Sequence, residues 1–213
     1  MLAAAGLGCA TAPTPKLVDA GALTPTLLVD IRYAGPNNFV GAPIDGYDAP
    51  RCLLSEPAAQ ALGAVQEDVA TVDLGLVVWD CYRPQRAVDQ FLAWSLGPPD
   101  PVLAARYFPN VAKRDLVPQG YIAARSGHSR ASTVDVGLVH LEDGVPLDMG
   151  TSFDFFDPRS GENGPVPEPA RANRARLRDA MERHGFVAYA PEWWHFTLAR
   201  EPYPDRYFDL PVR

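Results

Sequence analysis

The distribution of apolar residues along the chain predicts short helices and strands separated by proline-rich loops. After Ser55, apolar side chains recur at helical spacing as far as about residue 72, which predicts a helix capped by Ser55. A second helix is predicted to begin at Pro84, where proline suits the first helical position. A third is predicted over 168–184, with Gly185 as its C-terminal stop.

Shorter apolar and β-branched runs predict the strands. The runs 74–79 and 133–141 are predicted strands, and Asp143-Gly144 is expected to turn the second of them into a further strand toward residue 149. Three weaker candidates are 27–33, 186–189 and 194–198. Residues 97–127 and 157–169 are rich in proline and glycine and are predicted to be loops.

This order of helices and hairpins predicts an α+β fold with a central, mainly antiparallel sheet flanked by helices. The chain has 213 residues, which suits one domain with a sizeable core. We expect that domain to cover residues 17–213. Residues 1–16 are interpreted as a disordered tether or the remnant of a lipoprotein signal.

The N-terminus leaves the cellular compartment open. Residues 1–9 are small and apolar and lack the basic region and longer apolar core of a secretory signal. Leu7-Gly8-Cys9 followed by a Pro/Thr stretch nevertheless resembles the end of a bacterial lipoprotein signal whose start codon is assigned too far downstream. Our working hypothesis is export to the periplasm or cell envelope with a lipid anchor at Cys9; the alternative is a disordered cytoplasmic N-terminus.

The net charge and the lengths of the apolar runs argue against a nucleic-acid partner and against a transmembrane segment. The net charge of -7 and pI of about 5.0 argue against a broad surface for nucleic acid. No apolar run approaches the roughly 20 residues that span a bilayer, so no transmembrane segment is predicted. The sequence does not indicate an oligomeric state.

The cysteines do not form a metal motif. Three thiols without a C-x-x-C spacing do not predict a cysteine zinc site. Cys52 opens a short apolar segment and Cys81 ends another. If those segments are neighbouring strands, the two residues either form a disulfide in an oxidising compartment or remain buried thiols.

Histidines and acids supply candidate metal ligands. His128 precedes the predicted strand that carries Asp135, and His195 lies at the start of a terminal strand. Two histidines and a carboxylate with an open fourth position suit zinc, although each alone also suits a structural hydrogen bond. Glu192 converges with His195 only if the chain turns between them, and it could then act as a general base. The other histidines, His140 and His184, are interpreted as surface or structural residues.

Two further residues are candidates for substrate contacts. Arg83 follows a predicted strand and precedes a predicted helix, where it could hold a carboxylate or a developing oxyanion, or form a surface salt bridge. Asp154 could receive a substrate ammonium, with Asp148 and Asp157 as neighbouring alternatives and a capping role open to each of them.

Taken together, the motifs resemble one family. They are Asp80-Cys-Tyr-Arg-Pro84, Ser126-Gly-His-Ser-Arg-Ala-Ser-Thr-Val-Asp135, Met149-Gly-Thr-Ser-Phe-Asp154 and Glu192-Trp-Trp-His195. Their order and spacing are similar to those of the zinc D-alanyl-D-alanine dipeptidases, the type best known from vancomycin resistance. The resemblance covers roughly residues 26–213.

The resemblance implies a role for each matching residue. His128, Asp135 and His195 would bind one Zn²⁺ per chain. Glu192 would activate the zinc-bound water and later protonate the leaving amine, while Arg83 would stabilise the tetrahedral intermediate. Asp154 would hold the ammonium of the dipeptide, and Ser126 would help to bind its carboxylate. The implied reaction is hydrolysis of D-Ala-D-Ala to two D-alanines.

Two other functions remain open at this stage. A peptidoglycan D,D- or L,D-carboxypeptidase of the same superfamily would share the zinc chemistry but differ at Asp154. A zinc-binding module without catalysis would not need Glu192 or Arg83. One position departs from the resemblance, because Ala131 stands where the family often has glycine. If that position needs a positive φ, alanine costs about 1 kcal/mol.

Overall fold

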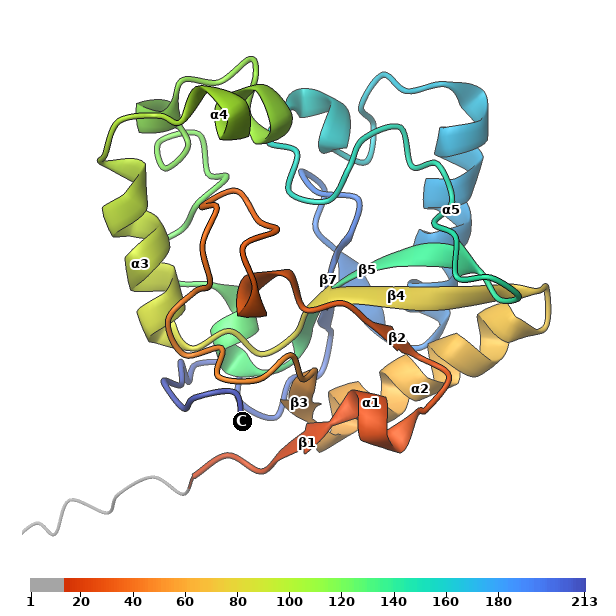
Figure 1. Ribbon diagram of the computed structural model, residues 1–213. Helices are drawn as coiled ribbons and strands as arrows, with labels where there is room; N and C mark the ends of the chain where they lie inside the picture. The colour runs from red at the N-terminus through yellow and green to blue at the C-terminus, as the bar shows by residue number, and fades with distance from the viewer. Residues whose placement is uncertain (1–13) are drawn as a thin grey trace, which may run out of the picture.

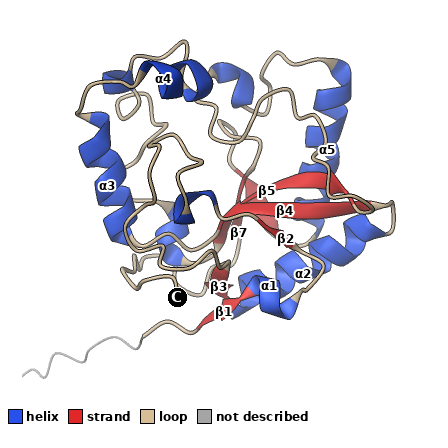
Figure 2. Ribbon diagram, in the orientation of Figure 1, coloured by secondary structure: helices blue, strands red, loops and turns tan. Residues whose placement is uncertain are grey.

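A five-stranded sheet with the strand order β2-β4-β5-β7-β6 organises the molecule (Figures 1 and 2). Its strands are β2 (Leu28–Val29), β4 (Leu74–Asp80), β5 (Thr133–His140), β7 (His195–Leu198) and β6 (Phe186–Ala188). Only β2 pairs in parallel, with β4, and the remaining pairs are antiparallel. The predicted fold class, α+β with a mainly antiparallel central sheet, is confirmed.

The computed structural model describes residues 14–213. Cys9 and most of the predicted tether therefore lie outside the described residues. A small second sheet pairs β1 (Leu17–Asp19) with β3 (Leu53–Ser55). Among the described residues, no helix is both long enough and apolar enough to cross a bilayer.

Helices cover the sheet and extend beyond the carboxyl end of β4. They are α1 (Ala20–Leu23), α2 (Glu56–Ala70), α3 (Gln85–Ser95), α4 (Pro101–Tyr107) and α5 (Glu168–Arg183), with 3₁₀ turns at Arg32–Ala34, Lys113–Asp115, Gly127–Arg130 and Pro158–Ser160. α2 and α5 contact each other and the sheet, whereas α3 and α4 lie away from them, where the long loops gather (Figure 1). The loops thus collect at one end of the central strands.

The two long helices form because their apolar side chains fall on one face. In α2, Leu62, Val65 and Val69 are buried, as the helical spacing predicts. In α5, Leu177 and Met181 are buried, and Gly185 ends the helix with φ +86°. The predicted helices are confirmed, and Ser55 directly precedes α2. Its hydroxyl makes no cap hydrogen bond, however, and pairs instead with that of Ser132 at 2.8 Å.

Three local predictions are wrong in detail. Only Leu28–Val29 of the expected strand 27–33 is extended, because the chain turns into a 3₁₀ helix at Arg32. The strand expected after Asp143-Gly144 is reduced to an isolated bridge between Val139 and Pro146. Within 97–127 the chain forms α4, which the Asp100 side chain caps by accepting from two backbone amides.

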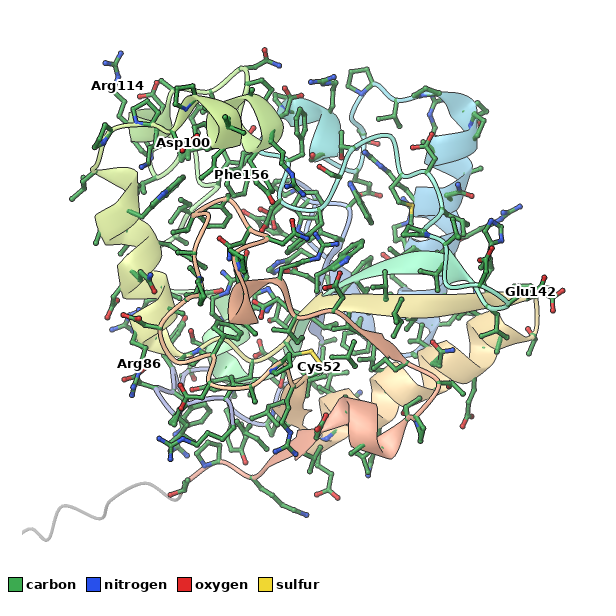
Figure 3. All side chains as sticks on the ribbon, in the orientation of Figure 1. Cys52, Arg86, Asp100, Arg114, Glu142 and Phe156 are labelled. Atoms are coloured by element: carbon green, nitrogen blue, oxygen red, sulfur yellow. A yellow bond between two sulfur atoms is a disulfide. The ribbon has the colours of Figure 1, made fainter. Side chains whose placement is uncertain are left out.

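A disulfide joins Cys52 to Cys81 in the core (Figure 3). Both residues are fully buried, and the bond ties β3 to the end of β4. The backbone amide of Tyr82 donates to the carbonyl of Leu53 at 2.9 Å beside it. Of the two states left open by the sequence, the structure contains the bonded one.

Removing this bond should destabilise the fold. It closes a loop with a sequence separation of 29, and a cross-link of that span raises the free energy of the unfolded chain by about 3.6 kcal/mol. We expect the double variant Cys52→Ala/Cys81→Ala to lose about that much free energy of unfolding in a denaturant titration. A non-reduced digest of the unaltered protein should contain the two cysteine peptides linked; finding them separate would contradict the bond.

Candidate metal centre and active site

Strand register brings three acidic and basic side chains into one row. Asp135 on β5 pairs with Asp80 on β4 and with His195 on β7. An irregularity between Val78 and Asp80 shifts the register at the end of β4. These three residues therefore lie side by side at the end of the sheet where the loops gather.

The short 3₁₀ helix Gly127–Arg130 adds His128 to this row. Ser126 caps that helix by accepting from the backbone amide of His128 at 3.3 Å. Ala131 ends it in the left-handed conformation, with φ +64°, and is fully buried. The departure from glycine therefore falls on a residue that needs a positive φ, at a cost of about 1 kcal/mol.

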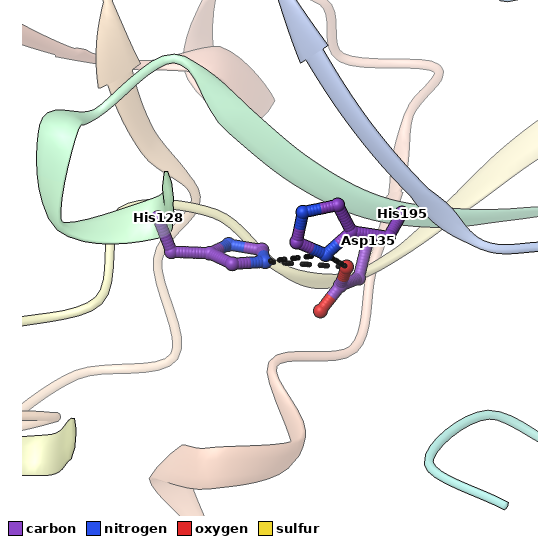
Figure 4. Close-up of side chains that lie close together, drawn as sticks. All are labelled: His128, Asp135 and His195. Carbon is purple, nitrogen blue, oxygen red and sulfur yellow. Dashed lines mark hydrogen bonds and ion pairs between the residues drawn. The ribbon is translucent and has the colours of Figure 1, made fainter. Parts of the chain in front are cut away.

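His128, Asp135 and His195 converge on one point (Figure 4). Asp135 Oδ1 lies 3.2 Å from His128 Nε2 and 3.1 Å from His195 Nδ1, and the two nitrogens are 3.3 Å apart. The carbonyl of Cys81 accepts from His128 Nδ1 at 2.7 Å, so Nε2 is left as a lone-pair donor. Asp135 Oδ1 is itself buried without a hydrogen bond.

A turn brings Glu192 to the same point. The amide of His195 donates to the carbonyl of Glu192 at 3.2 Å, which closes the turn, and Glu192 Oε2 lies 3.4 Å from His195 Nδ1. Burial raises the pKa of the Glu192 carboxyl to about 7. A carboxylate with that pKa can accept and release a proton near neutral pH.

Arg83 lies on the other side of Asp135. Its Nη2 is 3.6 Å from Asp135 Oδ2, and its guanidinium is held by Asp80, with Nε donating to Oδ2 at 2.9 Å. Burial alone would lower the pKa of Arg83, but nearby groups, Asp80 foremost, raise it well above its ordinary value. The guanidinium therefore stays charged, and it packs over the rings of Tyr33 and Phe91.

Asp80 had no role in the sequence analysis, and the structure makes it central to the site. Its fully buried carboxylate pairs with Arg83, lies 3.4 Å from His128 Nδ1 and accepts from the Tyr47 hydroxyl at 2.6 Å. The only signals in the sequence were its place at the start of the Asp80-Cys-Tyr-Arg-Pro84 motif and at the end of a predicted strand. Its partners come from distant segments, so sequence spacing alone could not identify them.

Asp154 is buried and lines, together with Arg83, Asp135 and Glu192, the cavity described below. It has φ +58°, and its Oδ2 accepts from the hydroxyl of Tyr33 at 2.9 Å. Burial, together with the charge of Asp135, raises the pKa of the Asp154 carboxyl well above its ordinary value. A cation entering the cavity would favour the charged form of this carboxyl. Tyr33 was not singled out from the sequence.

These groups line one cavity of about 220 Å³. Its polar lining is formed by Arg83, Arg125, Ser126, Asp135, Asp154, Glu192 and His195, and its aromatic walls by Tyr33, Phe39, Phe91, Tyr121, Phe156, Tyr189 and Trp194. Pockets for drug-sized ligands span roughly 300–1,000 Å³, so this cavity suits a smaller molecule. Of the residues to which the resemblance assigns a role, all line this cavity except His128, which is fully buried.

The remaining candidates have other partners. His140 is exposed, and His184 pairs with Asp68 at 3.2 Å. Asp148 accepts from the amide of Gly150, and Asp157 from that of Arg159. These residues have turn or surface roles, and neither aspartate lines the cavity.

Known proteins match this chain over nearly its whole length. The family model described as D-ala-D-ala dipeptidase matches residues 13–213. A D-alanyl-D-alanine dipeptidase of Streptomyces coelicolor is 48% identical over 184 residues, covering 86% of this chain and 91% of the relative. Dipeptidases of the same name from Enterococcus faecalis and Enterococcus faecium are 44% and 43% identical, with 86% of this chain and 91% and 92% of each relative covered. The chain belongs to the D-Ala-D-Ala dipeptidase family of metallopeptidases.

Proposed function

We propose that this protein hydrolyses free D-Ala-D-Ala to two D-alanines in a zinc-dependent reaction. The observation that carries the proposal is a small cavity with a His-Asp-His cluster and Glu192 on one side and buried Asp154 on the other. Relatives named D-alanyl-D-alanine dipeptidase, which are 43–48% identical to this chain, support the substrate.

The cluster fits zinc. A tetrahedral ion with ligands at roughly 2.0–2.1 Å requires ligand atoms about 3.3 Å apart. The three candidate ligand atoms of His128, Asp135 and His195 are separated by 3.1–3.3 Å. Without a cation, the lone pair of His128 Nε2 would face the unpaired carboxylate oxygen of Asp135, which is unfavourable in a buried site. Two imidazoles and a carboxylate are also a ligand set that zinc accepts.

The charges of the cavity suit a dipeptide with a free amino group. Asp80 is neutralised by Arg83, so the carboxyl groups that line the cavity, those of Asp135, Asp154 and Glu192, outnumber its remaining arginine, the exposed Arg125. A divalent ion near Asp135 and an ammonium at Asp154 would balance these carboxyl groups. An acylated amine carries no charge and would leave Asp154 buried and unpaired.

Each side chain of the site then has a separate part in the proposed reaction. Zinc, when bound, supplies Lewis acidity that polarises a carbonyl and makes water a better nucleophile at neutral pH. Glu192 takes the proton of the attacking water and delivers it to the leaving amine. Arg83, held by Asp80, offsets the negative charge that develops on the carbonyl oxygen. Ser126, which also lines the cavity, would contact the carboxylate of the dipeptide.

We also propose that the protein works in an oxidising compartment, the periplasm or cell envelope. The Cys52–Cys81 bond supports this location, because structural disulfides persist outside the reducing cytoplasm. A lipid anchor at Cys9 remains a prediction from the sequence.

The direct test is release of D-alanine from D-Ala-D-Ala, run beside N-acetyl-D-Ala-D-Ala. We expect cleavage of the free dipeptide only, loss of activity with a chelator, and recovery when zinc is restored. Cleavage mainly of the acylated substrate would assign the protein to the carboxypeptidases. No cleavage of either substrate by zinc-loaded protein would contradict the proposed function.

Glu192→Gln should abolish turnover while zinc content stays near one per chain. Loss of a general base costs roughly 10²–10⁴-fold in kcat, and the amide keeps the volume of the side chain. Glu162→Gln is the matched control, since Glu162 pairs with Arg178 outside the catalytic cavity. Turnover retained in the Glu192 variant would remove this residue as the base.

Asp154→Asn should weaken cleavage of the free dipeptide selectively. Losing one partner of a buried charge pair costs roughly 2–5 kcal/mol, so kcat/KM should fall at least about 30-fold. Any residual cleavage of the acylated substrate should change much less. Asp148→Asn, on the same loop but exposed, serves as the control. Equal losses on both substrates would argue against an ammonium contact.

A further inference from the structure

A buried arginine on α5, Arg174, forms hydrogen bonds to the loop that carries Asp154. We define the 149–161 loop as the chain from Met149 to Gly161. The guanidinium of Arg174 donates to four oxygens: the carbonyls of Met149 (2.7 Å), Arg159 (2.9 Å) and Gly161 (2.8 Å), and the hydroxyl of Thr151 (3.2 Å). All four acceptors belong to this loop, and they lie near its two ends.

Apart from packing over the ring of Trp193, the buried Arg174 side chain has its polar contacts with this loop. Its exposed fraction is 6%, and no carboxylate among residues 14–213 lies within ion-pair distance of it. Burial lowers its pKa to about 10, so the buried charge is a cost to the folded state. Carbonyl oxygens at both ends of the loop compensate that cost only while the loop keeps its shape.

The same loop contacts the turn that carries Glu192. The indole nitrogen of Trp193 donates to the Thr151 hydroxyl at 2.9 Å, and the backbone amide of Trp193 donates to the carbonyl of Ser160 at 2.9 Å. The hydroxyls of Thr151 and Ser160 are 3.0 Å apart. Thr151 therefore joins Arg174 to the residue next to Glu192.

The loop needs such support because of what it carries. Asp154 is a buried carboxyl with a positive φ, in the repulsive field of Asp135 and Glu192. A left-handed residue other than glycine costs about 1 kcal/mol or more and persists only where its surroundings hold it. Without its ties, the loop could relax and move Asp154 away from the cavity.

We propose that Arg174 and Thr151 are positioning residues that hold Asp154 in register with Glu192 and so select dipeptides with a free amino terminus. This inference rests on the proposed function and deepens it. Neither residue lines the catalytic cavity, so each acts through the loop and not by touching the substrate.

Thr151 allows the sharpest test. Thr151→Val keeps the shape of the side chain and removes the hydroxyl, whereas Thr151→Ser keeps the hydroxyl. For zinc-loaded protein we expect the valine variant to raise KM for D-Ala-D-Ala about 10-fold or more, with kcat within about threefold. The preference for the free over the N-acetylated dipeptide should fall by a similar factor. The serine variant should restore both values to within about twofold.

Arg174→Met removes all four donated bonds and should give the same KM effect. The matched control is Arg171→Met, one turn earlier on α5, whose side chain is 62% exposed and pairs with Glu168. An unchanged KM and preference in folded Arg174→Met and Thr151→Val, with only lower stability, would overturn the proposal. If Arg174→Met does not fold, the comparison of Thr151→Val with Thr151→Ser tests the proposal by itself.

Hydrogen exchange separates this proposal from the proposed function. Amides of 149–161 and 189–195 should exchange faster in Thr151→Val than in Thr151→Ser, whichever dipeptide the protein cleaves. If the unaltered protein cleaves no D-Ala-D-Ala but the two variants show this difference, the proposed substrate is overturned and the positioning role is supported. Equal exchange in both variants would overturn the positioning role even if D-Ala-D-Ala is cleaved.

Discussion

Antiparallel pairing of β5 with β4 on one side and β7 on the other is the constraint on which the site depends. It sets Asp135 opposite Asp80 and His195, so three strands that are distant in sequence contribute to one row. A slip of one residue in either pairing would turn a side chain to the opposite face of the sheet. Gly137 on β5 opposes such a slip, because a side chain at that place would clash with the ring of Trp79 on β4.

The cavity concentrates carboxyl groups where water cannot solvate them. Asp80 is paired with Arg83, and Asp135 faces the imidazoles of His128 and His195. Asp154 and Glu192 instead have raised pKa values. A site with these neighbours favours cations, which is the electrostatic basis for the proposed metal ion and substrate ammonium.

A disulfide and a set of hydrogen bonds, both outside the cavity, fix two of the segments that form its walls. The Cys52–Cys81 bond secures the end of β4, where the carbonyl of Cys81 accepts from His128 and Arg83 begins the next segment. On the opposite wall, Arg174 gathers the 149–161 loop around Asp154. The cavity is thus bounded by one segment fixed covalently and one fixed by hydrogen bonds, which suits a site that measures the length of a small substrate.

The sequence by itself determined the long helices, the central strands and the identity of the motif residues. Helical spacing in α2 and α5 and the apolar run of β4 are local properties, so they can be recognised without the rest of the chain. The order of the motifs also indicated the family, with His128, Asp135, His195 and Glu192 as its candidate residues. Their convergence, the roles of Asp80, Tyr33 and Arg174, and the choice between thiols and a disulfide at Cys52 and Cys81 were decided only by the tertiary structure. Each of these depends on contacts between segments tens of residues apart, and local sequence preferences carry no information about which distant side chains will meet.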